Sequence, residues 1–136
     1  MRVGIGIGIS ALLCAMAITA TALGDSAYTV EVRVAAHSGS VNTRRRVAAS
    51  GQAANAGQLS VYLAPAKCVR RRSAEARLPK VKLIISATVV GIYTQSKIFT
   101  GRGIGRHYAC AYLTGLAPNP GVRYAAAHVS YRVTAS

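Results

Sequence analysis

Arginine is the residue type in this sequence with the clearest chemical capacity, because it occurs in two uninterrupted runs. The runs are Arg44, Arg45 and Arg46, and then Arg70, Arg71 and Arg72, with Lys67 just before the second. A guanidinium group binds phosphate, sulfate or carboxylate through pairs of parallel hydrogen bonds. We therefore expect both runs to be exposed and to bind an anion. Two alternatives are a hydrated face that keeps the protein in solution and proteolytic processing after Arg46 or Arg72.

A third basic segment is rich in glycine: residues 101–106 read Gly-Arg-Gly-Ile-Gly-Arg. Successive backbone N–H groups in such a turn can hold an anion, and Arg102 and Arg106 would add positive charge. The segment matches neither the phosphate loop nor the dinucleotide-binding fingerprint, so no nucleotide cofactor is predicted. The alternative is a hairpin in which the glycines only permit positive φ.

The charge balance limits what the chain can do. There are 17 Lys and Arg against 3 Asp and Glu, a formal net charge of +14, and 51% of the residues are hydrophobic. So many apolar residues indicate a folded domain and exclude a disordered basic tail. The acids are Asp25, Glu31 and Glu75. They are too few to neutralise the arginines, and they almost exclude the paired carboxylates of a glycosidase.

Residues that could support other catalysis are dispersed. The histidines are His37, His107 and His128, and no Ser or Cys lies in a nucleophile motif. The one enzyme class that remains is a small basic secreted ribonuclease, in which these histidines and Glu31 would exchange protons. The cysteines show no spacing typical of zinc sites. The sequence therefore predicts no catalytic residues, metal or cofactor.

Residues 1–24 resemble a secretory signal peptide. Arg2 is followed by an uncharged apolar stretch that ends in small residues, with Gly24 before the expected cleavage site. The alternative is an uncleaved membrane anchor. Cleavage would leave a single domain, residues 25–136, that keeps nearly all of the positive charge outside the cytoplasm.

Cleavage would also remove Cys14 and leave Cys68 and Cys110. An even number of cysteines in an oxidising compartment predicts one disulfide between them. It would close a loop of about 40 residues and stabilise the fold by about 3 to 4 kcal/mol.

The remaining chain has the pattern of β-strands. Apolar residues alternate with polar ones over 28–34 and 59–63, and residues 80–93 are strongly β-branched. Residues 107–114 and 122–134 flank a turn-rich segment and predict a hairpin. The apolar face of the last strand changes between Val122 and Val133, which predicts a β-bulge near Ala126 to His128.

These strands predict an all-β fold, a small antiparallel β-sandwich with one disulfide. Tyr108 lies two residues before Cys110, which resembles the tyrosine corner of immunoglobulin-like domains, although the chain has no Trp. We expect Tyr108, Tyr112 and Tyr131 to point inward and Tyr62 to be exposed. The alternative is a small α+β fold in which the Ala-rich residues 47–58 form a short helix.

The sequence therefore predicts a secreted, strongly basic, non-catalytic β-sandwich that binds an anionic polymer or cell surface. Cell-envelope glycan, lipopolysaccharide and acidic lipid are suitable partners, the last implying contact with a membrane surface, whereas chromosomal nucleic acid is not expected outside the cytoplasm. The alternatives are a cationic toxin or effector that acts on another cell and, less favoured, the ribonuclease. We expect an extracellular, periplasmic or cell-envelope location, and the sequence specifies no oligomeric state.

Overall fold

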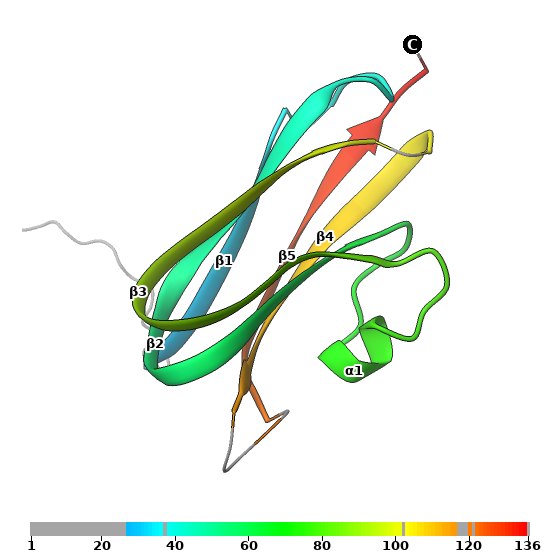
Figure 1. Cartoon of the computed structure of the whole chain (residues 1–136). Coiled ribbons are helices and arrows are strands. Elements are labelled where there is room, and N and C mark those ends of the chain that lie inside the picture. Colours follow the sequence, from blue (N-terminus) through cyan, green and yellow to red (C-terminus); the bar gives the residue numbers. More distant parts are fainter. Residues whose placement is uncertain (1–26, 37, 102, 117–119, 121, 136) are drawn as a thin grey trace, which may run out of the picture.

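Strands make up most of the fold (Figure 1). The structure is a computed structural model that describes residues 27–36, 38–101, 103–116, 120 and 122–135. Within these ranges the elements are β1 (Tyr28–Ala35), β2 (Arg44–Ala64), α1 (Arg72–Glu75), β3 (Lys82–Thr100), β4 (Gly105–Gly115) and β5 (Arg123–Val133). Every pairing between these strands is antiparallel. The predicted all-β class is confirmed.

Strands β2 and β3 are long and curve together, so that they take part in two halves of one curled sheet (Figure 1). Residues 44–53 of β2 pair with β1 on one edge and with residues 91–100 of β3 on the other. Residues 57–64 of β2 pair with β4 and with residues 82–89 of β3, and β5 pairs with β4. We call these the β1 half and the β4 half.

The strands bend where they pass from one half to the other. The β2–β3 register shifts between the pairs Ala53–Gly91 and Gly57–Val89, so β2 carries extra residues there. Gly91 has a φ of 71°, a conformation that residues with a Cβ rarely adopt. Gly91 therefore marks a bend within β3, which continues to Thr100.

The main core lies between the two halves, as expected for a sandwich. Among the odd-numbered residues of β2 and β4, Val47, Leu59 and Leu113 are fully buried in it. The halves also meet where β1 approaches β5: the rings of Tyr28 and Tyr124 stack with centroids 4.0 Å apart.

The prediction of a helix over residues 47–58 is wrong, because these residues belong to β2. Small side chains are needed here because the neighbouring strand lies very close. A Cβ on Gly51 would lie 2.1 Å from the backbone oxygen of Thr29 on β1, and Ala49 and Ala53 are buried in the core. The alanines are therefore a packing requirement of the sheet.

The bulge of the last strand also differs from its predicted place. The β4–β5 register shifts between Leu113–Ala125 and Thr114–Arg123, so the extra residue is Tyr124 rather than one of residues 126–128. The hairpin itself is confirmed, with the N–H of Gly115 bonded to the carbonyl of Val122 at 2.7 Å.

The Cys68–Cys110 disulfide is confirmed, with the two Cα atoms 5.7 Å apart. It does not join the two halves. Cys110 belongs to a second apolar cluster with Tyr62, Ala64 and Tyr112, on the face of the β4 half that points away from the main core. The disulfide therefore holds the segment 65–81, which includes α1, against this outer face.

The same finding corrects three predictions about tyrosines. Tyr62 is buried beneath the segment 65–81 instead of being exposed. Tyr108 and Tyr112 point to the outer face with Cys110, so the resemblance to an immunoglobulin tyrosine corner does not extend to their packing. Of the three tyrosines predicted to point inward, only Tyr131 lies in the main core.

Among the described residues, no helix is long and apolar enough to cross a lipid bilayer.

Candidate anion-binding surface

The second arginine run lines a hollow at one end of the β4 half. Its volume is about 560 Å³, and it is lined by Arg70, Arg71, Arg72, Ser73, Thr114, Val122 and Arg123. The first four lie in or just before α1, and the others lie where β4 ends and β5 begins. Four guanidinium groups and two hydroxyl groups therefore border one open space. We call it the arginine hollow.

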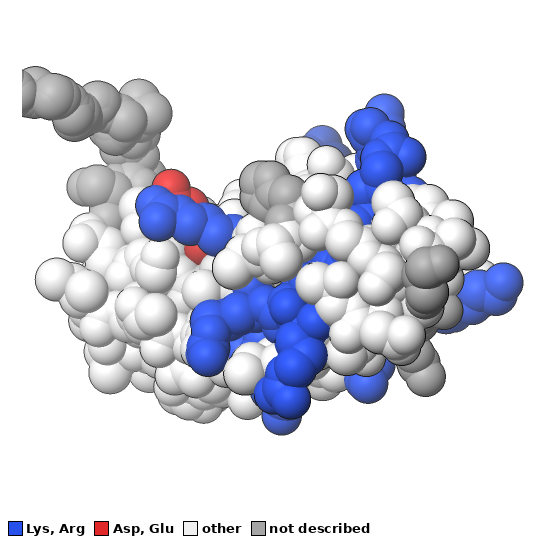
Figure 2. Space-filling model, turned by 90° about the horizontal axis from the view of Figure 1, so that it is seen from above, with Lys and Arg blue, Asp and Glu red and all other residues white. Residues whose placement is uncertain are grey.

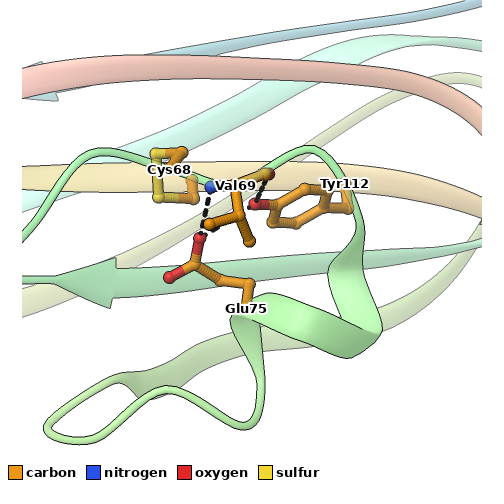
Figure 3. The surroundings of a disulfide bond; sticks show 5 residues. Cys68, Val69, Glu75 and Tyr112 are labelled. Atoms are coloured by element: carbon orange, nitrogen blue, oxygen red, sulfur yellow. Dashed lines mark hydrogen bonds between the residues drawn. A yellow bond between two sulfur atoms is a disulfide. The ribbon is translucent and has the colours of Figure 1, made fainter.

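The segment that carries these arginines is held by hydrogen bonds as well as by the disulfide. Oε1 of Glu75 accepts hydrogen bonds from the Val69 N–H and the Tyr112 hydroxyl, both at 3.0 Å (Figure 3). Arg72 donates from Nη1 to the Tyr62 hydroxyl at 3.4 Å. The arginine hollow thus rests on a cross-linked segment, although the segment has little regular secondary structure.

Glu75 is unusual because it is fully buried and yet pairs with no described arginine or lysine. Its Oε2 atom has no hydrogen-bond partner within the described part of the chain. Burial, followed by the hydrogen bond and the charge of Glu75, raises the pKa of Tyr112 well above 10. Tyr112 therefore remains a protonated donor in neutral solution.

The same place holds a group of potential metal ligands. The sulfur atoms of Cys68 and Cys110 and a carboxylate oxygen of Glu75 lie within 4.8 Å of one another. The sulfur atoms are bonded to each other, however, and the thiolate is the form of cysteine that binds metals. In its oxidised form this group does not have the donors of a zinc site.

Arg45 corrects the expectation that the first run is exposed as a block. It is 1% exposed and points into the core, on the same face of β2 as Val47. Its guanidinium donates, over 2.9 to 3.3 Å, to the main-chain carbonyl oxygens of Gly39, Ser40, Thr43 and Arg132. It also lies over the Tyr131 ring, 5.6 Å from the centroid. Main-chain carbonyl groups thus accept the hydrogen bonds of this buried guanidinium, in a chain that has few carboxylates.

Arg44 and Arg46 are exposed on the outer face of the β1 half, because strand alternation turns them away from Arg45. Arg46 donates to the Ser96 hydroxyl at 3.2 Å. The structure therefore does not bring the two arginine runs together, and Arg44 and Arg46 do not line the arginine hollow.

The remaining predicted anion-binding residues are also apart from the hollow. Lys67 is exposed next to the disulfide. Arg106 is exposed on β4 opposite Arg132, and the eight residues between Arg106 and Thr114 correspond to about 26 Å of extended strand. Arg102 lies outside the described residues.

The glycine-rich segment is not a hairpin, because β3 and β4 do not pair with each other. It connects the β1 half to the β4 half. Gly105 has a φ of 121°, which agrees with the expected need for glycine. The carbonyl of Gly103 accepts a hydrogen bond from Nε2 of His107 at 2.8 Å.

The residues considered for a ribonuclease are not brought together. His107 stacks on Tyr131, whereas His128 is exposed on β5 opposite Cys110. Glu31 lies on β1 in an ion pair with Arg33, 2.9 Å apart. His37 lies outside the described residues. The geometry therefore gives no support to proton exchange among them.

Sequence analysis did not include Arg123 among the anion-binding residues. Arg123 has no other basic residue next to it in the sequence. Its place at the start of the last strand, directly after the hairpin turn, was the one sequence feature that could have indicated a role. The β4–β5 pairing puts it opposite Thr114 and thus beside the second arginine run.

Basic side chains are spread over the molecular surface. Figure 2 shows them projecting in several groups from one face, with the only visible acidic atoms beside a basic side chain. This agrees with the Glu31–Arg33 ion pair. Arginines that face solvent therefore have little acidic surface with which to pair.

Comparisons with known proteins give little similarity. No protein family model matches the chain, and no curated protein sequence is significantly similar to it. Among solved structures, the chain is similar to the CARDB domain of the PF1109 protein from Pyrococcus furiosus, determined in complex with di-metal ions. The TM-score is 0.48 and the identity 14%, over 79% of this chain and 93% of that one.

Proposed function

We propose that the chain is a non-catalytic binding domain for a polymer that carries phosphate or sulfate groups. The observation that supports this most is the arginine hollow, where Arg70, Arg71, Arg72 and Arg123 border one space. Guanidinium groups match the oxygen atoms of such anions, and the Ser73 hydroxyl supplies a further donor. Four arginines carry more positive charge than one phosphate or sulfate group can balance, which favours a ligand with several charges.

The other exposed arginines favour an extended ligand. Arg44 and Arg46 lie on the β1 half, and Arg106 and Arg132 lie far along the β4 half. Each of these exposed sites would contribute little by itself, because water and salt screen its charge. A long polyanion that contacts several of them would release counterions at each contact and gain affinity.

We propose that this binding takes place outside the cytoplasm, at a cell envelope. Two features support a secreted location: the signal-like residues 1–24 and the disulfide, which persists in oxidising compartments. Anionic envelope glycans and lipopolysaccharide are then suitable ligands.

The test compares two triple variants that remove the same charge from different places. One variant replaces Arg70, Arg71 and Arg123 with Gln, and the other replaces Arg44, Arg46 and Arg132 with Gln. We expect the first to weaken binding to a sulfated polysaccharide or to lipopolysaccharide by about tenfold or more, because hydrogen bonds to charged groups contribute roughly 1.5 to 3 kcal/mol.

The second triple variant should lose less affinity, and binding of the parent protein should weaken steeply with salt. Equal losses in the two variants would show that only net charge matters. Binding that does not change with salt would contradict the proposal altogether.

A further inference from the structure

The two halves of the sheet are closed on one side and open on the other. On the closed side β1 approaches β5, where Tyr28 stacks on Tyr124 and the N–H of Thr134 donates to Gly39 at 2.8 Å. On the open side β3 alone passes from one half to the other, bending at Gly91. Its two ends, Lys82 and Thr100, border a groove that leads toward the main core.

The groove consists of two adjoining hollows of about 470 and 360 Å³, a size typical of small-molecule sites. Both are lined by Leu63, Lys82 and Thr100, which makes them continuous. The residues of the main core that reach the groove are Leu63, Phe99 and Tyr131. A ligand in the groove would therefore touch the apolar interior.

Apolar side chains at the groove are also unusually exposed. Leu83 is 48% exposed, Ile98 42% and Ile104 70%, and all three line one of the two hollows. Apolar surface gathered around a hollow is typical of a binding site, whereas single exposed apolar residues are ordinary.

Among the described residues that line this groove, the basic side chains other than His107 are lysines. Lys80, Lys82 and Lys97 line it, and they are three of the four lysines of the chain. A lysine can lay its methylene groups on an apolar surface while its ammonium group stays in water. The acids Glu31 and Glu75 do not line the groove, so the three charges are free to attract an anionic head group.

We propose that the groove binds a single-chain lipid with an anionic head group. The acyl chain would lie on Leu63 and Phe99, with the exposed Ile98 at the rim of the groove, and the head group would meet the ammonium groups of Lys80, Lys82 and Lys97. Thr100 lines the same space, and its hydroxyl can donate a hydrogen bond to a head-group oxygen atom. This site is separate from the arginine hollow, because no residue lines both.

The first test measures the affinity of the full chain, with its disulfide intact, for fatty acids of increasing chain length. Each methylene buried in the groove should increase affinity about fourfold, from roughly 0.8 kcal/mol per group, until the groove is filled. The alcohol of the same chain length should bind more weakly, because it lacks the charge. Affinity that does not depend on chain length, or equal binding of acid and alcohol, would overturn the proposal.

The second test compares two exposed isoleucines of β3. Ile98 lines the groove, whereas Ile92 is 89% exposed and lines neither hollow. Ile98→Asp should lower affinity for a long-chain fatty acid by about tenfold or more, because it puts a carboxylate beside the acyl chain. Ile92→Asp should leave affinity unchanged. Equal effects of the two substitutions would contradict the site.

A mapping experiment on the unmodified protein keeps the proposal testable even if a variant does not fold. NMR signals of Leu63, Ile98 and Tyr131 should shift on addition of fatty acid, and those of Arg70 to Arg72 should not. The opposite pattern would place the lipid in the arginine hollow. The Arg70, Arg71 and Arg123 variant should retain fatty-acid binding, so that failure of the polymer proposal can be told from failure of this one.

Discussion

The hydroxyl group of Tyr112 lies 3.0 Å from Oε1 of Glu75, inside the protein and with no cation paired to the carboxylate. The same hydroxyl also donates to the Val69 carbonyl, and the Val69 N–H donates to Glu75. Glu75 and Tyr112 thus fix the residue next to Cys68, and through it the segment that carries Arg70, Arg71 and Arg72. A buried acid, rather than a surface ion pair, positions the basic residues of the arginine hollow.

Replacing Glu75 should therefore cost stability in a way that depends on the substituent. Glu75→Ala leaves the Val69 N–H without an acceptor and removes one of the two acceptors of the Tyr112 hydroxyl, so we expect a loss of about 2 to 4 kcal/mol in the free energy of unfolding. Glu75→Gln keeps an acceptor oxygen and should lose less than half as much. Urea denaturation measures both, and a Gln variant less stable than the Ala variant would contradict this role.

Replacing Arg45 should lower the stability of the fold, whereas Arg45 itself should not contact a ligand. Arg45→Met leaves four main-chain carbonyl oxygens without their donor, so we expect a loss of about 3 kcal/mol or more. Arg44→Met, at the exposed neighbour, should change stability by less than about 0.5 kcal/mol. Thermal unfolding of the two variants checks this, and a similar melting temperature for both would show that Arg45 is not structural.

The buried tyrosines predict the response to alkaline pH. Burial raises the pKa of Tyr93 and of Tyr131 from 10.0 to about 12, with the charge of Arg45 opposing the shift of Tyr131, and burial raises that of Tyr112 as well. Because these pKa values are higher in the folded than in the unfolded chain, their contribution to stability is complete below pH 10 and is lost as pH rises toward 12.

Absorbance of tyrosinate during an alkaline titration should accordingly show that Tyr93, Tyr112 and Tyr131 ionise late, together with the unfolding seen by circular dichroism. Ionisation of these three tyrosines near pH 10, with the fold retained, would contradict the burial of their side chains.

Removal of the disulfide should loosen the segment 65–81 more than the sheet. The paired substitution Cys68→Ala with Cys110→Ala should lower the free energy of unfolding by about 3 to 4 kcal/mol. An arginine-specific protease should then cut sooner after Arg70, Arg71 or Arg77 than after Arg46, which the β2–β3 ladder protects. Equal rates at both places would show that the disulfide does not hold this segment.

Much of the fold could be predicted from the sequence, because strand alternation is a local property. The positions of β1, β4 and β5 follow from it, and the disulfide follows from the two remaining cysteines. The continuation of β2 through its Ala-rich residues could not be predicted, since Gly51 and Ala53 are required by the closeness of β1, which is a tertiary effect.

The candidate site was predicted only in part for the same reason. The composition shows that the arginines have few carboxylate partners. It does not show that main-chain carbonyl groups accept the hydrogen bonds of Arg45. Arg123 joins the second run only through the β4–β5 pairing. The face to which Cys110 points depends on the register of β2 and β4, which no local pattern specifies.

Because β2 and β3 pass through both halves, they also determine how the protein unfolds. The β2–β3 ladder runs through both halves, and of the other ladders only β4–β5 does not include β2 or β3. Unfolding of one half alone would require the β2–β3 pairing to end in the middle of both strands. Heat or mechanical pulling should therefore disrupt the whole β-structure in one cooperative step, with no intermediate in which a single half survives.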